Sequence, residues 1–462
     1  MVSSKTPAVE VTLLWLFIFE FALLVSLPAS WREEIVTAGF AGLLLVAWKQ
    51  RHLAIASAKA LWLGASALAL WTAAQPFFAV HPSTIGWKGG IVFLASFGAA
   101  AALPTLNRDG RHDKAVRYAF DAFEYFIVAQ LVVSFFSGIG EFYGYRTGSV
   151  RAFGFLSDSI SPIIGFFIAR NAVEHRHLRC FLAAFALAVT GGKAALGITI
   201  ATFVVLLLLV GGRRYWLPAR NGLLTLLGAY FCVHAAIALE VPPNQFYALS
   251  LTEEEKRISQ IELRTLRELR SIESGQIGAL PHALLVLTRE LPMSLVQAGA
   301  NRLLSYAAAL EIIHRYPLVG AGFNRSHDYI PQMVRLNPGG INSLFVDPGI
   351  AWSTVTALHN PSLLVFAELG LIGFILFWIV CIGMLAVFWK TRNHMRTVQA
   401  GPVSWRRSLA VAASAWGTTF VLLHQTTGWI EPGHPQLVFL ALCVGVAIEA
   451  QSRRTTMPGE AE

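Results

Sequence analysis

The sequence predicts an all-α polytopic membrane protein with about twelve transmembrane helices. Its composition, the spacing of its apolar stretches and the distribution of its basic residues each support this fold class. Of the 462 residues, 55% are hydrophobic and 14% are charged, and the mean hydropathy is +0.56. Soluble domains have about 45–50% apolar and about 25% charged residues, so the composition excludes an ordinary soluble globular protein.

Twelve apolar stretches have roughly the length that a helix needs to cross a bilayer, which is about 20 residues. They place helices 1–9 in residues 1–239 and helices 10–12 in residues 359–450. The polar segment between them, residues 240–358, is expected to form one large helical loop, and a short tail follows at residues 451–462. The stretches are residues 9–28, 34–48, 60–79, 87–104, 117–137, 153–169, 178–190, 194–211, 221–239, 361–388, 408–424 and 435–450.

Lysine and arginine residues predict the orientation of these helices, because cytoplasmic loops retain basic residues and short translocated loops do not. With the N-terminus inside, the cytoplasmic segments hold 21 of the 36 basic residues, and the short outer loops hold five: Arg32, Lys88, Arg146, Arg151 and Lys193. Both termini and the 451–462 tail are therefore expected in the cytoplasm, and the large loop on the opposite side of the membrane. The net charge of +9 then reflects topology, and no nucleic-acid partner is predicted.

The large loop has the composition of a soluble segment and predicts helices of its own. A capping box at residues 252–255 begins the first of them, and another is expected over residues 301–316. Arg302 lies at the start of this later helix, with Tyr306 one turn on. Because an arginine there opposes the helix dipole, an external anion explains its position better than helix stability does.

Two basic residues of the short outer loops, Arg151 and Lys193, abut predicted helix ends. Lys193 follows Gly191-Gly192 in a tight turn, where backbone amides and an ammonium would suit a phosphate. The alternative for both is an anchor whose side chain reaches lipid headgroups. The turn is not a nucleotide-binding P-loop, since the upstream glycine and the final Ser/Thr are missing. Histidines and cysteines show no metal-ligand spacing, so no metal or other cofactor is predicted.

The most specific local pattern is His359-Asn360-Pro361 at the start of helix 10. Asn is a favoured N-cap and Pro a favoured first-turn residue, which puts His359 just outside the helix at the outer membrane surface. A helix N-terminus disfavours imidazolium and attracts phosphate, so a neutral histidine base and an anion would lie together there. A histidine without function is the alternative. Glu368, about two turns into the helix, is either functional or held by a structural hydrogen bond or ion pair.

At these residues the chain resembles the shared domain of O-antigen ligases and O-antigen or exopolysaccharide polymerases. The resemblance covers about residues 180–380, and twelve helices with a large periplasmic loop between helices 9 and 10 also match the ligase architecture. The matching motifs are Arg302-x-x-x-Tyr306, His314-Arg315-Tyr316-Pro317-Leu318-Val319-Gly320-Ala321-Gly322, His359-Asn360-x-x-Leu363 and Glu368-Leu369-Gly370-x-x-Gly373.

The resemblance implies a metal-independent glycosyltransferase of the GT-C type that moves a glycan from undecaprenyl diphosphate to an acceptor hydroxyl in the periplasm. It gives His359 the role of base and places Arg302 on the diphosphate. Where the family usually shows Thr-x-Ser-Arg after helix 7, this chain has Thr190-Gly191-Gly192-Lys193. Lysine lacks the bidentate fork of arginine, so Lys193 acts as a point charge or Arg151 carries more of the task. Asn360, Glu368 and Tyr306 are expected to support the site.

The acceptor distinguishes two enzymes that would share this donor. A ligase uses the lipid A core, and a polymerase uses a second lipid-linked glycan; the sequence does not separate them. A transporter of lipid-linked glycans would be expected to have broken helices and charges near the membrane midplane, whereas most candidate polar groups here are predicted at the outer face. A sugar-binding or structural membrane protein without activity is a further alternative, which the importance of His359 would distinguish.

Overall fold

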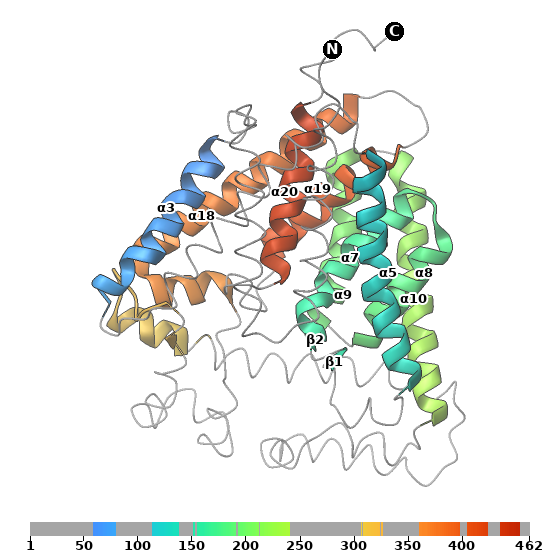
Figure 1. Ribbon diagram of the computed structural model, residues 1–462, viewed down its shortest axis with the longest axis horizontal. Helices are drawn as coiled ribbons and strands as arrows, with labels where there is room; N and C mark the ends of the chain where they lie inside the picture. Colours follow the sequence, from blue (N-terminus) through green and yellow to red (C-terminus); the bar gives the residue numbers. More distant parts are fainter. Residues whose placement is uncertain are drawn as a thin grey trace, which may run out of the picture.

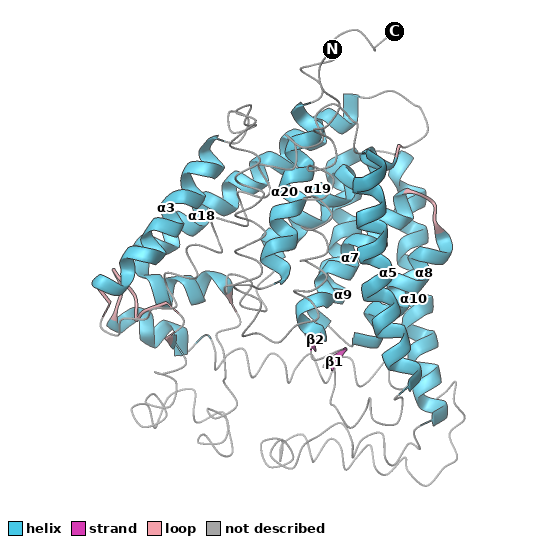
Figure 2. Ribbon diagram, viewed as in Figure 1, coloured by secondary structure: helices cyan, strands magenta, loops and turns pink. Residues whose placement is uncertain are grey.

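The computed structural model of the chain describes residues 59–79, 113–137, 151–152, 155–190, 193–211, 213–240, 306, 308–323, 325–326, 360–397, 404–423 and 435–452. Within these ranges the fold is helical, apart from turns and one antiparallel hairpin of two-residue strands, β1 (Arg151–Ala152) and β2 (Phe155–Leu156) (Figure 2). The secondary structure therefore agrees with the predicted all-α class. The predicted helices at 9–28, 34–48 and 87–104 and most of the loop at 240–358 lie outside the described residues.

Each predicted span that falls within the described residues forms a helix. The bounds agree to within a few residues with two exceptions: α10 begins eight residues before its predicted span, and α18 ends nine residues after its predicted span. The elements are α3 (Lys59–Ala74), the 3₁₀ turn η2 (Gln75–Phe77), α5 (Asp113–Ser137), α7 (Ser157–Val173), α8 (His177–Thr190), α9 (Lys193–Val205), the π-helix η3 (Leu206–Gly211), α10 (Arg213–Glu240), α18 (Pro361–Thr397), α19 (Trp405–Leu423) and α20 (Pro435–Ser452).

Length and composition allow one of the described helices, α18 over Pro361–Asn393, to cross a membrane by itself. Shorter apolar helices are Ile160–Val173, His177–Thr190, Ala194–Leu208 and Phe439–Gln451. That the chain crosses the membrane twelve times therefore stays a prediction.

The described helices form a bundle in which α7 to α10 alternate in direction, as do α18 to α20 (Figure 1). α18 packs along α3 and α19, α7 packs against α8 and α9, and α10 packs against α8. The helix ends gather at two ends of the bundle. We call the end that contains Gln75, β1 and Asn360 the junction end, and the opposite end, which contains Asp113 and Arg170, the charged end.

Trp416 of α19 lies at the centre of the apolar core. Its ring stacks on Phe420 at 4.7 Å between centroids and meets Phe439 of α20 and Phe166 of α7 edge to face. Its indole N–H donates to the carbonyl of Pro162 at 2.7 Å, so the buried donor is satisfied. Aromatic packing thus joins α7, α19 and α20 in the middle of the bundle.

Candidate functional site

The structure describes the predicted site residues to different extents. Asn360, Glu368 and Tyr306 are described with their side chains, and Arg151 and Lys193 by their backbone. His359 and Arg302, the predicted base and diphosphate ligand, lie outside the described residues. The geometry of the site is therefore built from the segments that flank these two residues in the sequence.

Asn360 caps the N-terminus of α18, as the sequence predicts. Its side-chain Oδ1 accepts a hydrogen bond from Leu363 N at 3.1 Å, and its carbonyl accepts the first helical bond, from Leu364 N, at 2.7 Å. Pro361 occupies the first helical position, where its missing N–H costs nothing. The helix therefore begins immediately after the His359-Asn360 pair.

α18 is interrupted at Gly370, a feature that the hydropathy of residues 361–388 does not predict. Gly370 has φ 69° and ψ −171°, so a nine-residue helix over 361–369 is followed by a longer one from residue 371. Figure 1 shows the two parts of α18 at an angle to each other near the end of α3. Such a break removes backbone hydrogen bonds that the helix would otherwise make.

Residues 317–323 of the large loop supply hydrogen-bond partners for the backbone groups that lack helical partners at this break. Three backbone hydrogen bonds join the two segments, and they run in both directions. They are Ala321 N to Ala367 O at 2.9 Å, Gly322 N to Glu368 O at 3.0 Å and Leu371 N to Pro317 O at 2.9 Å. The loop segment thus replaces part of the missing helical ladder.

Two glycines make this close approach possible. Gly320 has φ 79°, and a Cβ atom on it would lie 2.3 Å from the carbonyl oxygen of Glu368. A Cβ atom on Gly370 would lie 2.2 Å from the carbonyl oxygen of Leu318. Both the left-handed backbone and the lack of space exclude other residues, which gives a physical reason for glycine in both sequence motifs.

Two side chains of α3 and η2, which the sequence interpretation missed, complete the contact. Gln75 is fully buried, and its side-chain amide bonds three backbone groups. The three bonds are Gln75 Nε2 to Val319 O (3.1 Å), Gln75 Nε2 to Glu368 O (3.0 Å) and Phe323 N to Gln75 Oε1 (3.3 Å). Trp71 of α3 adds a fourth bond, from its Nε1 to Leu369 O at 3.0 Å. A glutamine before Pro76 at the end of an apolar stretch was the available signal. We call Trp71, Gln75, residues 317–323 and residues 367–371 the junction.

Glu368 makes a structural hydrogen bond at the junction. The side chain is buried, and its Oε1 accepts a hydrogen bond from Ser326 N at 3.3 Å. This contact is a structural hydrogen bond of the kind that the sequence allows, and the functional interpretation of Glu368 stays a prediction. The carboxylate therefore helps to hold the loop against α18.

The described part of the predicted loop helix leads directly into the junction. Residue 306 and residues 308–315 are helical, Ala308 and Ile312 are buried, and Tyr306 is half-buried. Gly320 N donates to Tyr316 O at 3.1 Å beyond the helix end. The predicted end of this helix, just before Pro317, is thus confirmed.

Arg151 and Lys193 also belong to the junction end of the bundle. Arg151 begins β1 and pairs with Leu156 just before α7 starts. Lys193 is the first residue of α9, three positions after α8 ends at Thr190. In Figure 1, β1 and the start of α9 lie toward the same end of the bundle as the first part of α18.

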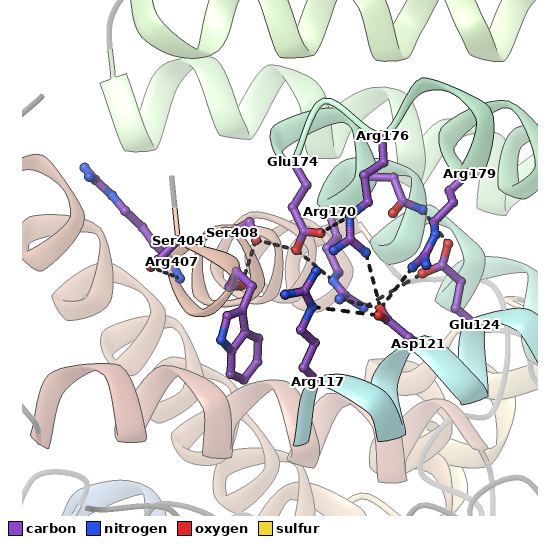
Figure 3. A network of polar contacts seen from close by, with 12 residues as sticks. Arg117, Asp121, Glu124, Arg170, Glu174, Arg176, Arg179, Ser404, Arg407 and Ser408 are labelled. Atoms are coloured by element: carbon purple, nitrogen blue, oxygen red, sulfur yellow. Dashed lines mark hydrogen bonds and ion pairs between the residues drawn. The ribbon is translucent and has the colours of Figure 1, made fainter. Parts of the chain in front are cut away.

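The charged end holds a buried ionic network. The sequence indicated its arginines only as basic residues of cytoplasmic loops. Arg170 of α7 has a side chain with 0% exposure and three carboxylate neighbours, and Asp121 of α5 also faces arginines of α8 and of the α7–α8 turn (Figure 3). The contacts are Arg170 to Asp121 (2.6 Å), Glu174 (3.1 Å) and Glu124 (3.8 Å), Arg176 to Glu174 (2.8 Å) and Asp121 (3.5 Å), Arg179 to Asp121 (3.2 Å), and Asn171 to Glu124 (2.5 Å).

α19 joins this network through two contacts. Ser408 Oγ donates to Glu174 Oε1 at 2.6 Å, and Arg406 forms an ion pair with Asp113 at the start of α5. The network therefore fastens α5, α7, α8 and α19 to one another. Buried charges with this many partners are expected to hold helices in one arrangement, because separating them would leave unpaired charges.

Comparison with known proteins assigns no family. No protein-family model matches the sequence, and no curated protein matches it. A functional conclusion must come from the residues and their arrangement.

Proposed function

We propose that this protein is an O-antigen-ligase-like glycosyltransferase of a bacterial inner membrane. It moves a glycan from undecaprenyl diphosphate to an acceptor hydroxyl on the lipid A core, on the periplasmic side, without a metal and with inversion at the anomeric carbon. The junction is the observation that carries the proposal. It joins residues 317–323 of the large loop to residues 367–371 of α18, and two of the motifs that carry the resemblance lie in these segments.

A membrane location is supported by the outside of the bundle. Aliphatic side chains along the middle of several helices are exposed, which is unusual over large areas of a soluble surface. They include Leu63 and Leu70 of α3, Leu224 and Leu227 of α10, and Ile375, Ile379 and Ile382 of α18. Lipid would cover these side chains.

The distribution of charge along the bundle supports the predicted orientation. Many lysine and arginine residues of the described helices and of the α7–α8 turn lie toward the charged end, as expected for a cytoplasmic side. They include Lys59, Lys114, Arg117, Arg170, Arg176, Arg179, Arg406 and Arg407. The junction end would then face the periplasm, where the donor glycan and the acceptor are proposed to meet.

The proposed chemistry needs cations and one base. The acceptor hydroxyl oxygen attacks the anomeric carbon, the bond from that carbon to the diphosphate oxygen breaks, and undecaprenyl diphosphate leaves with the electron pair. Arg302, Lys193 and Arg151 would stabilise the growing charge on the diphosphate. His359, before the N-cap of α18, would take the hydroxyl proton.

Two structural features bear on the transporter alternative. The broken helix at Gly370 is of the kind that transporters use, but here the break is filled by residues 317–323 and their hydrogen bonds. The network around Arg170 also fastens helices at the charged end, and opening that end would break buried ion pairs, at about 3–5 kcal/mol for each partner removed. Both features favour a site that opens to one side.

The test is transfer by the purified protein in proteoliposomes that contain an undecaprenyl-diphosphate-linked glycan. One arm supplies lipid A core, a second supplies only the lipid-linked glycan, and a third contains EDTA. Labelled glycan on lipid A core, with or without EDTA, is the expected result. Chain elongation on the lipid-linked glycan alone would instead identify a polymerase. Absence of any new glycosidic bond, or complete loss of transfer in EDTA, would contradict the proposal.

A further inference from the structure

Gln75 lies between the two backbone segments that meet at the junction. It is the first residue of η2, directly after α3. Its amide bonds the loop segment at Val319 and Phe323 and the first part of α18 at Glu368. These partners are 244, 248 and 293 residues away in the sequence. Within the described residues, Gln75 bonds both of the segments that meet at the junction.

We propose that Gln75 is a positioning residue for glycan transfer, which holds the first part of α18 and therefore the His359-Asn360 pair at its start. This inference rests on the proposed function. Residues 361–369 form only a short helix, and the backbone break at Gly370 separates it from the rest of α18. Its direction must therefore be set by contacts to other segments.

The chemistry of the amide explains why glutamine is needed. Nε2 donates to two carbonyls while Oε1 accepts from a backbone N–H. A carboxylate of the same shape would keep the acceptor but lose both donors, and an alanine would lose all three bonds. Because Gln75 is fully buried, water would not readily replace them, and the unsatisfied backbone groups would favour a reoriented helix.

The expected consequence is a change in catalysis without loss of the fold. A displacement of about 1 Å at a reacting group can lower the rate about a hundredfold. Two of the proposed diphosphate ligands, Lys193 and Arg151, lie on other elements. We therefore expect Gln75→Ala and Gln75→Glu to lower kcat by a larger factor than they raise KM for the donor.

Three measurements on the full-length protein in proteoliposomes test this inference. The first is kcat and KM for transfer to lipid A core in wild type, Gln75→Ala and Gln75→Glu. The second is the pH profile of transfer, which should lose its histidine-dependent limb in the variants because the base no longer reaches the acceptor. The third is amide hydrogen exchange, which should become faster at residues 360–369 in the variants. Thr72→Val is the matched control, since Thr72 Oγ1 donates only to Leu68 O of its own helix among the described contacts.

Each outcome has a defined meaning. Wild-type kcat in both Gln75 variants would overturn the inference. So would a lower rate with an unchanged pH profile and unchanged exchange at 360–369, because a smaller amount of folded enzyme would produce that result. If the wild type transfers no glycan, the proposed function fails, and the exchange measurement alone then decides whether Gln75 holds the first part of α18.

Discussion

Gly320 and Gly370 lie backbone against backbone, although one belongs to the large loop and the other to α18. A Cβ atom built on Gly320 would be 2.5 Å from Gly370 N, and both residues have positive φ. The contact allows a loop to complete the hydrogen bonds of a broken helix. It also explains why two short glycine motifs that are far apart in the sequence belong to one structural unit.

Gly370→Ala should therefore destabilise the junction by about 1–3 kcal/mol, the cost of a strained backbone position, and lower transfer more than tenfold. Thermal unfolding and the transfer assay measure the two effects. Gly228→Ala is the control, because its Cβ would meet no atom within 4 Å on the exposed side of α10. An unchanged unfolding midpoint in Gly370→Ala would show that the helix break is not required.

Arg170→Met should destabilise the protein by about 3–5 kcal/mol, because it leaves buried carboxylates without their shared cation. Unfolding monitored in detergent measures this change. Arg220→Met should stay within about 0.5 kcal/mol of wild type, since Arg220 is exposed and bonds only the neighbouring Asn221 among the described contacts. Equal stability of the two variants would show that the network at the charged end does not fasten the helices.

His359→Ala should lower transfer by about 10² to 10⁴, the usual contribution of a positioned base, while donor binding is retained. In the wild type, transfer should fall as the pH drops through the pKa of this histidine, because imidazolium cannot accept the acceptor proton. His177→Ala, at an exposed position of the charged end, controls for the loss of a histidine. Activity of His359→Ala within a few-fold of wild type would remove this residue from the mechanism.

Arg302→Ala should abolish or strongly reduce transfer, since each charge-assisted bond to the diphosphate contributes about 1.5–3 kcal/mol. Arg151→Ala and Lys193→Ala should also reduce it, and Lys193→Arg should be tolerated if the residue contacts phosphate. Donor binding and transfer measure these effects. Arg315→Ala is the control, because Arg315 forms only an exposed helical ion pair with Glu311 at 2.9 Å among the described contacts. Full transfer by Arg302→Ala at normal expression would exclude it from the donor site.

The predicted topology places residue 270 in the periplasm and residue 455 in the cytoplasm. Cysteines introduced at these positions, in a variant without the four native cysteines, should react with a membrane-impermeant maleimide from opposite sides. Labelling of residue 270 only from the cytoplasmic side would contradict the topology.

The features that the sequence alone determined are local ones. Apolar stretches predicted the described helices because a helix satisfies its own backbone hydrogen bonds and needs only apolar side chains around it. The Asn360-Pro361 cap was predictable for the same reason, since its partners lie within four residues. The lysine and arginine pattern likewise predicted which helix ends share one end of the bundle.

Only the tertiary structure decided the break at Gly370, the role of Gln75 and the burial of Arg170. Each depends on partners from other helices or from the loop, such as Val319 for Gln75 and Asp121 for Arg170, which lies 49 residues away. A hydropathy pattern reports how much apolar surface a segment can bury, but it does not report which segments meet. Directional hydrogen bonds and ion pairs form only after the helices have packed, and for this reason the junction and the charged network could not be predicted from the sequence.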